Sequence, residues 1–304
     1  MGQKDIAEKT LEAYNDVFAD IVNVLLFKGK RQVKEKDLKD AIPVSIYKIS
    51  EKLHTQERDV AKFWQNCSVR IALYGFENQT EIDKKMPLRV MSYDAASYKQ
   101  QIIDGEENEK QAEKELYPVI SLVLYFGNKR WEKPKSLCEA INISDVVKPF
   151  VSDYKINVFE IAYLSDEQIN MFKSDFKIVA DYFVQMRKNK NYVPSRKVIK
   201  HVAEVLQLLQ ILTGNKKYEF DEKLIKMKGK RITMDTWLDD KLENAEKKGE
   251  KKGELDTLFR LMKKGILTLK QAAEEMGMSV SKFKKELEKH SLDYSAFVWL
   301  FIKN

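Results

Sequence analysis

The sequence contains little cysteine and little histidine, and this scarcity excludes several kinds of chemistry. Only Cys67 and Cys138 occur in 304 residues. They lie far apart and form no CxxC pair, so we expect neither a disulfide framework nor a thiolate metal site. The three histidines, His54, His201 and His290, show no ligand spacing, and no zinc site is expected. A reducing compartment fits this composition.

Long apolar runs are also missing. The longest, residues 118–126, is about half the length that a membrane-spanning helix requires. The opening residues, MGQKDIAEKT, contain no apolar signal core. There is no Walker A loop, Gly-rich dinucleotide fingerprint or Ser-His-Asp order, which argues against NTPase, dehydrogenase and serine hydrolase functions. We therefore expect a soluble, cytoplasmic protein without a membrane partner or an organic cofactor.

Charged residues are abundant but unevenly distributed, and the net charge is +7. Residues 187–231 contain 13 Lys and Arg against 4 Asp and Glu, and residues 241–289 contain 13 against 9, so the rest of the chain is net acidic. An acidic part joined to basic parts suits a metal-carboxylate site combined with a surface that binds a polyanion. Ordinary lysine-rich solubility explains the same counts and stays open.

The hydrophobic pattern of the first half of the chain is that of an α/β region. Apolar residues at helical spacing predict a helix over residues 11–27, which Gly29 closes. Runs rich in β-branched and aromatic residues predict a meander of three strands, at residues 44–49, 60–67 and 69–76. Pro87 suits the first turn of a helix running to about residue 102, and the apolar run 117–126 suits a strand covered on both faces. The predicted order is helix, three strands, helix, strand.

The pattern becomes helical beyond Gly127. Helices are expected over residues 166–187, 196–212 and 234–247, and Gly214 ends the second of them. A tandem repeat follows, in which Lys-Lys-Gly-Glu begins at Lys247 and again at Lys251. Glycines four residues apart allow a close helix contact, but a solvated hinge or linker is the favoured interpretation.

Residues 268–287 have the spacing of a helix-turn-helix. Small Ala273 permits a close helix crossing, and Gly277 provides the turn. Ser279 is placed to cap the second helix, while Phe283 and Leu287 fill the joint. The second helix presents basic side chains suited to phosphate or groove contacts, at Lys282, Lys284 and Lys285. Such hairpins also mediate packing between proteins, so both roles stay open.

The third predicted strand ends in a cluster of polar and acidic residues. Side chains alternate along a strand, so Glu77 and Gln79 project to the same face. Asp59 lies in the preceding strand, where antiparallel pairing brings its carboxylate near Glu77. Two carboxylates beside a polar partner favour Mg²⁺ or Mn²⁺, which lowers the pKa of a bound water and stabilises a leaving oxyanion. By spacing alone the motif is weak, and surface polar residues at a strand end are the alternative.

The segment GFENQTEIDKKMPLRVMSYD, residues 75–94, surrounds this motif. It is similar to the central block of the recombination-promoting nuclease family, whose members are often labelled transposases. Residues 18–23 and the pair Arg58-Asp59 resemble its upstream blocks, and residues 117–127 followed by Trp131 resemble the strand after it. The resemblance implies an α/β fold with the αβββαβ core of PD-(D/E)XK, restriction-endonuclease-like enzymes and an α-helical C-terminal extension.

The resemblance also implies roles for individual residues. Asp59 corresponds to the motif aspartate, Glu77 to the motif acid, and Gln79 to a position that is lysine in most of the superfamily. Asp59 and Glu77 would ligate Mg²⁺, for which Mn²⁺ can substitute, with the peptide carbonyl of Asn78 as a third ligand. Neutral Gln79 can only orient the attacking water or contact the metal, whereas a lysine would also offset phosphate charge. The departure from lysine leaves the catalytic rate open.

Three further residues are accessory candidates. Asp20, on the first helix, is a candidate acid near the metal, with solvation on the helix surface as the alternative. Arg89 and Tyr93 share a helix face four residues apart and are placed to meet DNA phosphates. Arg89 can equally pair with an acid such as Glu81 or Asp94.

Together these features predict a Mg²⁺-dependent DNA endonuclease, which is a phosphodiester hydrolase of low sequence specificity that promotes recombination. The protein would be a homodimer if two active sites act on the two strands of a duplex. The expected parts are a nuclease core at residues 1–150, a basic helical extension at residues 151–240, a charged glycine-containing linker at residues 241–254 and a helix-turn-helix-like tail at residues 255–304.

RNA stays open as a substrate. One alternative is a non-catalytic DNA-binding or mobile-element accessory protein that acts through the basic tail, and Gln79 keeps it open. Another is a protein interaction module with an acidic partner.

Overall fold

The computed structural model describes residues 11–41, 44–49, 52–57, 60–76, 82–107, 116–222, 225 and 231–290, with the backbone alone at 44–49, 52–57, 72–76, 104–107 and 288–290. The chain divides between residues 235 and 236 into two compact units. None of the helices in the described ranges combines the length and the apolar character that a membrane span needs.

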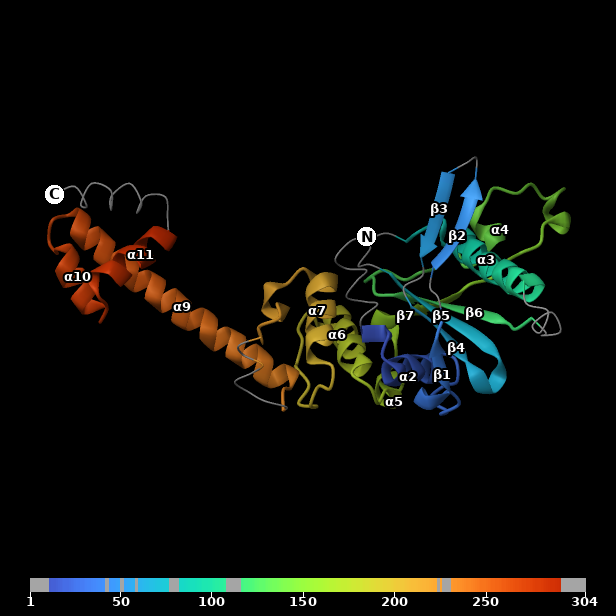
Figure 1. The fold of residues 1–304 in the computed structure, drawn as a ribbon, viewed down its shortest axis with the longest axis horizontal. Helices are drawn as coiled ribbons and strands as arrows, with labels where there is room; N and C mark the ends of the chain where they lie inside the picture. The colour runs from blue at the N-terminus through green and yellow to red at the C-terminus, as the bar shows by residue number, and fades with distance from the viewer. Residues whose placement is uncertain are drawn as a thin grey trace. The chain divides into compact units, whose positions relative to one another are not determined.

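The first unit is built on a five-stranded mixed sheet (Figure 1). Its strand order is β1 (Leu38–Asp40), β4 (Val60–Trp64), β5 (Val69–Phe76), β6 (Val119–Tyr125) and β7 (Asn157–Glu160). β4 runs antiparallel to β1 and β5, whereas β5, β6 and β7 are parallel to one another. The start of β4 therefore lies at the same end of the sheet as the ends of β1, β5, β6 and β7. We call this the carboxyl end of the sheet.

The strands β2 (Val44–Ile49) and β3 (Lys52–Glu57) form a hairpin that is separate from this sheet (Figure 1). The predicted meander is therefore wrong in its first strand, because β2 pairs with β3 and the short β1 lies beside β4 instead. Residues 44–49 have the composition of a strand, but composition does not specify a pairing partner, and β3 follows after a very short connection. The predicted order of helix, three strands, helix and strand is retained, with β1 as the first strand.

Helices cover both faces of the sheet. On one face, Met86, Val90 and Tyr93 of α3 (Met86–Glu107) pack in one buried cluster with Val123 and Tyr125 of β6. All residues from Leu122 to Phe126 are fully buried, as expected for a strand covered on both faces. The predicted strand over residues 117–126 is confirmed.

The opposite face of the sheet carries α2 (Asn15–Leu25) and α6 (Phe176–Asn189). The ring of Phe126, just after β6, lies 6.4 Å from that of Phe176 and 5.2 Å from that of Phe183, both in α6. Lys62 of β4 lies 5.8 Å from the ring centroid of Phe18 in α2. The shorter helical turns of this unit are α4 (Leu137–Ala140) and the 3-10 turns at Glu35–Asp37, Gln65–Cys67, Lys148–Phe150, Ile161–Tyr163 and Lys216–Tyr218.

The first two helices that follow the sheet both differ from the prediction: the one expected over residues 166–187 is broken, and the one expected over residues 196–212 begins only at Val202. The single helix expected over residues 166–187 is two helices, α5 (Asp166–Met171) and α6. The backbone N–H groups of Lys173 and Ser174, in the break, donate to the carboxylate of Asp20, and an α-helix would not leave both free for this. Helix α7 (Val202–Thr213) ends at Gly214, whose φ of 68° suits glycine, as the sequence predicted.

The second unit contains most of α9 (Met234–Lys263), with α10 (Leu269–Glu275) and α11 (Val280–His290). The segment 241–254, expected to be a linker, lies inside α9. Its alanine, leucine, glutamate and lysine residues favour a helix, which offsets a cost of about 1 kcal/mol for each glycine. A side chain built on Gly249 or Gly253 would meet no atom within 4 Å, so neither glycine mediates a close helix contact within the described ranges.

A small apolar core holds the helical hairpin of α10 and α11 together. It consists of buried residues from all three helices, Leu255, Met262, Ala272, Ala273, Phe283 and Leu287. Gly277 takes a φ of 60° in the turn, and the backbone N–H of Lys282 donates to Ser279 Oγ at 3.3 Å. The predicted crossing, turn and cap of this hairpin are all present.

Candidate functional site

The residues that carry the predicted metal motif, Asp59, Glu77, Asn78 and Gln79, lie outside the described residues. The strands on either side of them are described. β4 begins at Val60, directly after Asp59, and β5 ends at Phe76, directly before Glu77. Val60 is paired with Leu73 in the antiparallel register, so these two strand ends lie at the carboxyl end of the sheet.

A buried lysine lies close to the start of β4. Lys62 is opposite Asp40 of β1 in the register, and its ammonium group donates a hydrogen bond to that carboxylate. The Lys62 side chain is 2% exposed, whereas that of Asp40 is 88% exposed. A buried ammonium group needs such a partner because removal from water is costly. The pair fixes one positive charge inside the sheet near its carboxyl end.

The structure brings together two accessory candidates on α3, Arg89 and Tyr93. Arg89 donates from Nη1 to Asp83 Oδ2 at 3.0 Å, and Asp83 also accepts the backbone N–H of Lys85. Burial alone would lower the pKa of Arg89, but hydrogen bonds with Tyr93 and Asp83 raise it above its ordinary value. Among the described residues the acid that pairs with Arg89 is thus Asp83, and the guanidinium group stays charged at any physiological pH.

The other acid considered for Arg89, Asp94, has a different role. It is buried, and it accepts hydrogen bonds from Ser121 Oγ at 2.6 Å and from the hydroxyl of Tyr154. These contacts join α3 to β6 and to the segment before β7. Glu81, the remaining candidate partner, lies outside the described residues.

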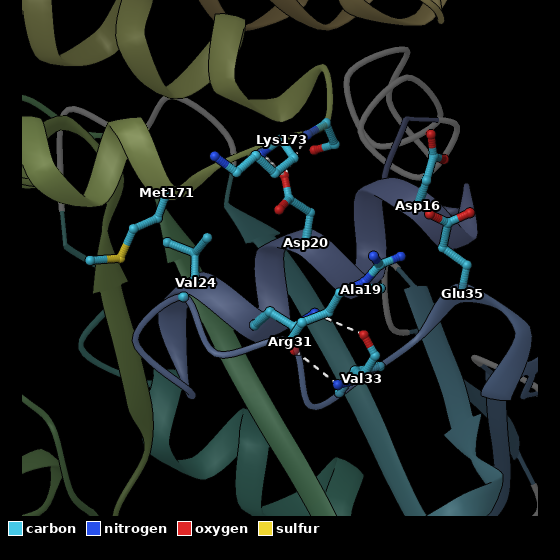
Figure 2. Close-up of a pocket in the computed structure, with 12 residues that line it drawn as sticks. Asp16, Ala19, Asp20, Val24, Arg31, Val33, Glu35, Met171 and Lys173 are labelled. Atoms are coloured by element: carbon cyan, nitrogen blue, oxygen red, sulfur yellow. Dashed lines mark hydrogen bonds between the residues drawn. The ribbon is translucent and has the colours of Figure 1, made fainter.

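Asp20 of α2 lies in a pocket of about 410 Å³, which is also lined by Asp16, Arg31, Glu35 and Lys173. Its Oδ2 accepts the backbone N–H groups of Lys173 at 2.7 Å and Ser174 at 2.6 Å. Figure 2 shows the carboxylate pointing from α2 towards Lys173. The observed contacts give Asp20 a structural function at the start of α6. Its role near a metal stays a prediction.

The N-terminal part of α2 is tied to the start of α7 through Asp16. This carboxylate accepts Lys200 Nζ at 2.6 Å and lies 3.2 Å from His201 Nε2. Burial by itself would raise the pKa of Asp16, but the hydrogen bonds from Lys200 and His201 outweigh it and hold the pKa below its ordinary value. The ring of His201 also stacks on that of Tyr14, with centroids 3.8 Å apart.

A second charged cluster lies at the carboxyl end of the sheet, beyond β6 and β7. Glu160, the last residue of β7, accepts the backbone N–H of Trp131 at 2.8 Å and Arg130 Nη1 at 3.2 Å. The guanidinium carbons of Arg130 and Arg187 lie 4.4 and 4.5 Å from the ring centroid of Tyr163. Both cations therefore lie within cation-π distance of one aromatic ring, whose faces are electron-rich and attract them.

Tyr125, at the end of β6, carries a buried hydroxyl group with no hydrogen-bond partner among the described residues. Burial, followed by the nearby Glu160 and Tyr163, raises its pKa above the ordinary value. A Cβ atom on Gly127 would lie 2.1 Å from this hydroxyl oxygen, so only glycine leaves room for the tyrosine. The chain after β6 is thereby held close against the strand.

Local sequence patterns did not predict the cluster of Arg130, Glu160, Tyr163 and Arg187, whose members come from three separate segments. Arg130 stands next to Trp131, which the family resemblance emphasises, and this adjacency was the available signal. No group of three or more His, Cys, Asp or Glu side chains placed to hold a metal occurs within the described ranges.

Comparison with known families identifies the chain. Residues 36–218, more than half of the sequence, match the model of the family described as "Putative transposase, YhgA-like". No curated protein and no solved structure gave a match. The match begins just before β1 and extends past α7, so it spans the whole sheet, with α3 on one face and α6 on the other, and leaves out α2. This confirms the resemblance that the sequence showed, and the protein belongs to the YhgA-like transposase family.

Proposed function

We propose that the protein is a metal-dependent endonuclease that hydrolyses phosphodiester bonds in DNA with low sequence specificity and promotes DNA recombination. The observation that carries the proposal is the antiparallel register of β4 and β5, with Val60 opposite Leu73. It places the strand ends next to Asp59 and Glu77 at one end of one sheet. The proposal is that the two carboxylates meet there, as a hard divalent cation requires.

The order of the elements supports the same proposal. Helix α2 is followed by β1, β4 and β5, then by α3 and β6. Apart from the inserted β2–β3 hairpin, this is the αβββαβ order of the PD-(D/E)XK core that the sequence resemblance implies. The proposal therefore includes this core, with Asp59 as the motif aspartate and Glu77 as the motif acid.

In the proposed site Asp59, Glu77 and the carbonyl of Asn78 hold Mg²⁺ or Mn²⁺. When bound, the metal supplies Lewis acid chemistry, which lowers the pKa of water and stabilises charge on the leaving oxygen. Gln79 has no charge, so its part is limited to orienting water through its amide. Arg89 remains a cation at any physiological pH and is proposed to meet a DNA phosphate, with Tyr93 holding it in place.

The hairpin of the second unit is proposed to hold the DNA backbone through α11. Lys282 and Lys285 are exposed and Lys284 is partly exposed, on a helix whose apolar residues face the core. Contacts from flexible lysines to phosphate add affinity but carry no base information, which agrees with low sequence specificity.

The direct test is cleavage of supercoiled plasmid in Mg²⁺, Mn²⁺ or chelator by the wild type, Asp59→Ala and Glu77→Ala. We expect metal-dependent nicking by the wild type and a loss of about 100-fold or more in both variants, because each loses a metal ligand. Asp145→Ala serves as the matched control, since Asp145 is exposed and lies in the loop before β7. It should cut like the wild type.

Two results would overturn the nuclease assignment: a wild type that never cuts, or Asp59 and Glu77 variants that cut as well as the control. If DNA binding were then unaffected by Asp59→Ala, the non-catalytic DNA-binding function would take its place. The same metal chemistry hydrolyses DNA and RNA, so the assay is repeated on RNA. Cutting of only one of the two identifies the substrate.

A further inference from the structure

Two arginines from distant segments meet on one tyrosine ring at the carboxyl end of the sheet. Tyr163 ends the 3-10 turn after β7, and its hydroxyl donates to the carbonyl of Asn128 at 2.6 Å. Arg130 comes from the loop after β6, and Arg187 comes from the last turn of α6. The three side chains are therefore positioned by a strand end, a loop and a helix end, each of which is fixed by other contacts.

Each guanidinium group is anchored by one hydrogen bond and keeps further donors for a ligand. Arg187 donates from Nε to the carbonyl of Ala162 at 2.6 Å, and Arg130 donates from Nη1 to Glu160 at 3.2 Å. A guanidinium group has five N–H donors. Within the described part of the chain these are the hydrogen bonds that the two groups make, so most donors of the pair are open to an incoming acceptor.

The charge around the ring favours an anion. Arg130 and Arg187 contribute two positive charges, and Glu160 contributes one negative charge that is already engaged by Trp131 and Arg130. The side chain of Arg130 is 57% exposed, and the neighbouring Lys129 is exposed as well. A phosphate group carries several acceptor oxygens and matches the planar fork of arginine.

The position of the cluster relates it to the proposed nuclease site. β7 is parallel to β6, and β6 is parallel to β5, with Phe76 opposite Tyr125 and Tyr125 opposite Glu160. The end of β7 is thus two strands from the end of β5, which corresponds to about 10 Å across the sheet. Both places lie at the carboxyl end.

From this geometry we infer that Arg130, Tyr163 and Arg187 form a phosphate-binding site that holds the DNA backbone beside the bond that is cut. Tyr163 holds the two guanidinium groups in place, and the arginines bind the phosphate oxygens. The inference rests on the proposed function for its ligand, DNA. Its test is made without cleavage, so that the two can fail separately.

The experiment measures binding of a fluorescently labelled duplex oligonucleotide by anisotropy, in chelator and at several salt concentrations. Arg130→Gln and Arg187→Gln are each expected to raise the Kd roughly 5- to 10-fold at about 0.1 M salt and to reduce the slope of log Kd against log salt by about one. Arg196→Gln is the matched control. The Arg196 side chain is 90% exposed in the same unit, and its removal also deletes one charge.

The role of the ring is tested by two substitutions of Tyr163. Tyr163→Phe keeps the ring and deletes the bond to Asn128, so it should bind DNA within about twofold of the wild type, since an exposed hydrogen bond contributes little. Tyr163→Leu removes the ring that both arginines contact and is expected to weaken binding about as much as one Arg→Gln change. Circular dichroism establishes that each variant is folded, and Arg130→Gln carries the charge-deletion test if Arg187→Gln fails to fold.

The outcomes separate the two proposals. If the salt slope is unchanged in both Arg→Gln variants, or falls as much in Arg196→Gln, the phosphate site does not exist and binding is spread over the surface. If the wild type binds DNA, loses affinity in the arginine variants and never cuts plasmid, the phosphate site stands and the nuclease assignment fails. Arg187→Lys keeps the charge but loses the planar fork, so a wild-type salt slope with an affinity between those of the wild type and Arg187→Gln supports the site.

Discussion

The carboxyl end of the sheet and the helical hairpin of the second unit present basic side chains by opposite means. At the sheet, Lys62, Arg130 and Arg187 are held by partners that lie 22 to 30 residues away in the chain. In the hairpin, the bonds of the capping box of α10 and of the α11 cap, at Thr268 and Ser279, span three residues. The long-range pair of Lys251 with Glu286, at 3.0 Å, joins α9 to α11 and involves none of the lysines proposed to meet DNA. A partner from a distant segment holds a charged side chain at one point in space. A local cap stabilises the end of a helix but does not hold the basic side chains on its surface. The sheet is therefore suited to chemistry and the hairpin to loose contact with a polyanion.

The largest effect is expected from Phe283→Ala in the hairpin. Phe283 is fully buried in a core of only a few side chains, and its loss should cost about 3–4 kcal/mol. Because the hairpin relies on this core, α10 and α11 should lose protection from amide hydrogen exchange while β4, β5 and β6 keep theirs. Equal loss of protection in the strands would show that the two units unfold together and would break the comparison.

A smaller effect is expected from the ion pair between β1 and β4. Asp40→Ala leaves the buried ammonium group of Lys62 without its carboxylate, which should cost about 2 kcal/mol in urea unfolding. Lys62→Met removes the charge and keeps the volume, so it should change stability by less than about 1 kcal/mol. A larger loss of stability in Asp40→Ala than in Lys62→Met is the result expected for a buried charge. If both substitutions had the same effect, the pair would contribute no more than its packing.

Local sequence signals predicted the elements well and their assembly less well. The strand over residues 69–76 and the turn at Gly277 follow from residue types within a few positions. β1 was missed because Leu38–Asp40 carries no strand signal, and it exists because β4 offers an open edge. The pairing of residues 44–49 with β3 was missed for the same reason, since pairing is decided by neighbours in space.

The candidate site divides in the same way. The metal motif was found from the sequence because Glu77 and Gln79 stand close together and because a family block surrounds them. The cluster on Tyr163 was not, because Arg130 and Arg187 are 57 residues apart and no local pattern links them. Arg89 shows an intermediate case. The helix spacing gave its neighbour Tyr93, but its carboxylate partner, Asp83, was not among the acids considered.

The smallest effect, and the one that sharpens the comparison by pH, concerns Asp16. Its pKa lies below the ordinary value of 3.8 in the folded protein, because hydrogen bonds from Lys200 and His201 outweigh burial. A lowered folded pKa means that the pair stabilises the protein above about pH 4 and that this stability is lost as the pH falls through the folded pKa. Asp16→Asn should therefore cost about 1 kcal/mol at pH 7 and progressively less below pH 4.

The measurement for Asp16 is urea unfolding of the wild type and Asp16→Asn at several pH values between 7 and 3. Glu35→Gln is the matched control, because Glu35 lines the same pocket and contacts neither Lys200 nor His201 through a hydrogen bond among the described residues. A difference between wild type and Asp16→Asn that did not shrink in acid would mean that the contribution of Asp16 is not that of a charged carboxylate. If the difference in unfolding free energy shrinks in acid, the charge pair of Asp16 is one of the contacts that hold α2 against α7. Such a long-range pair does not occur in the caps of the hairpin.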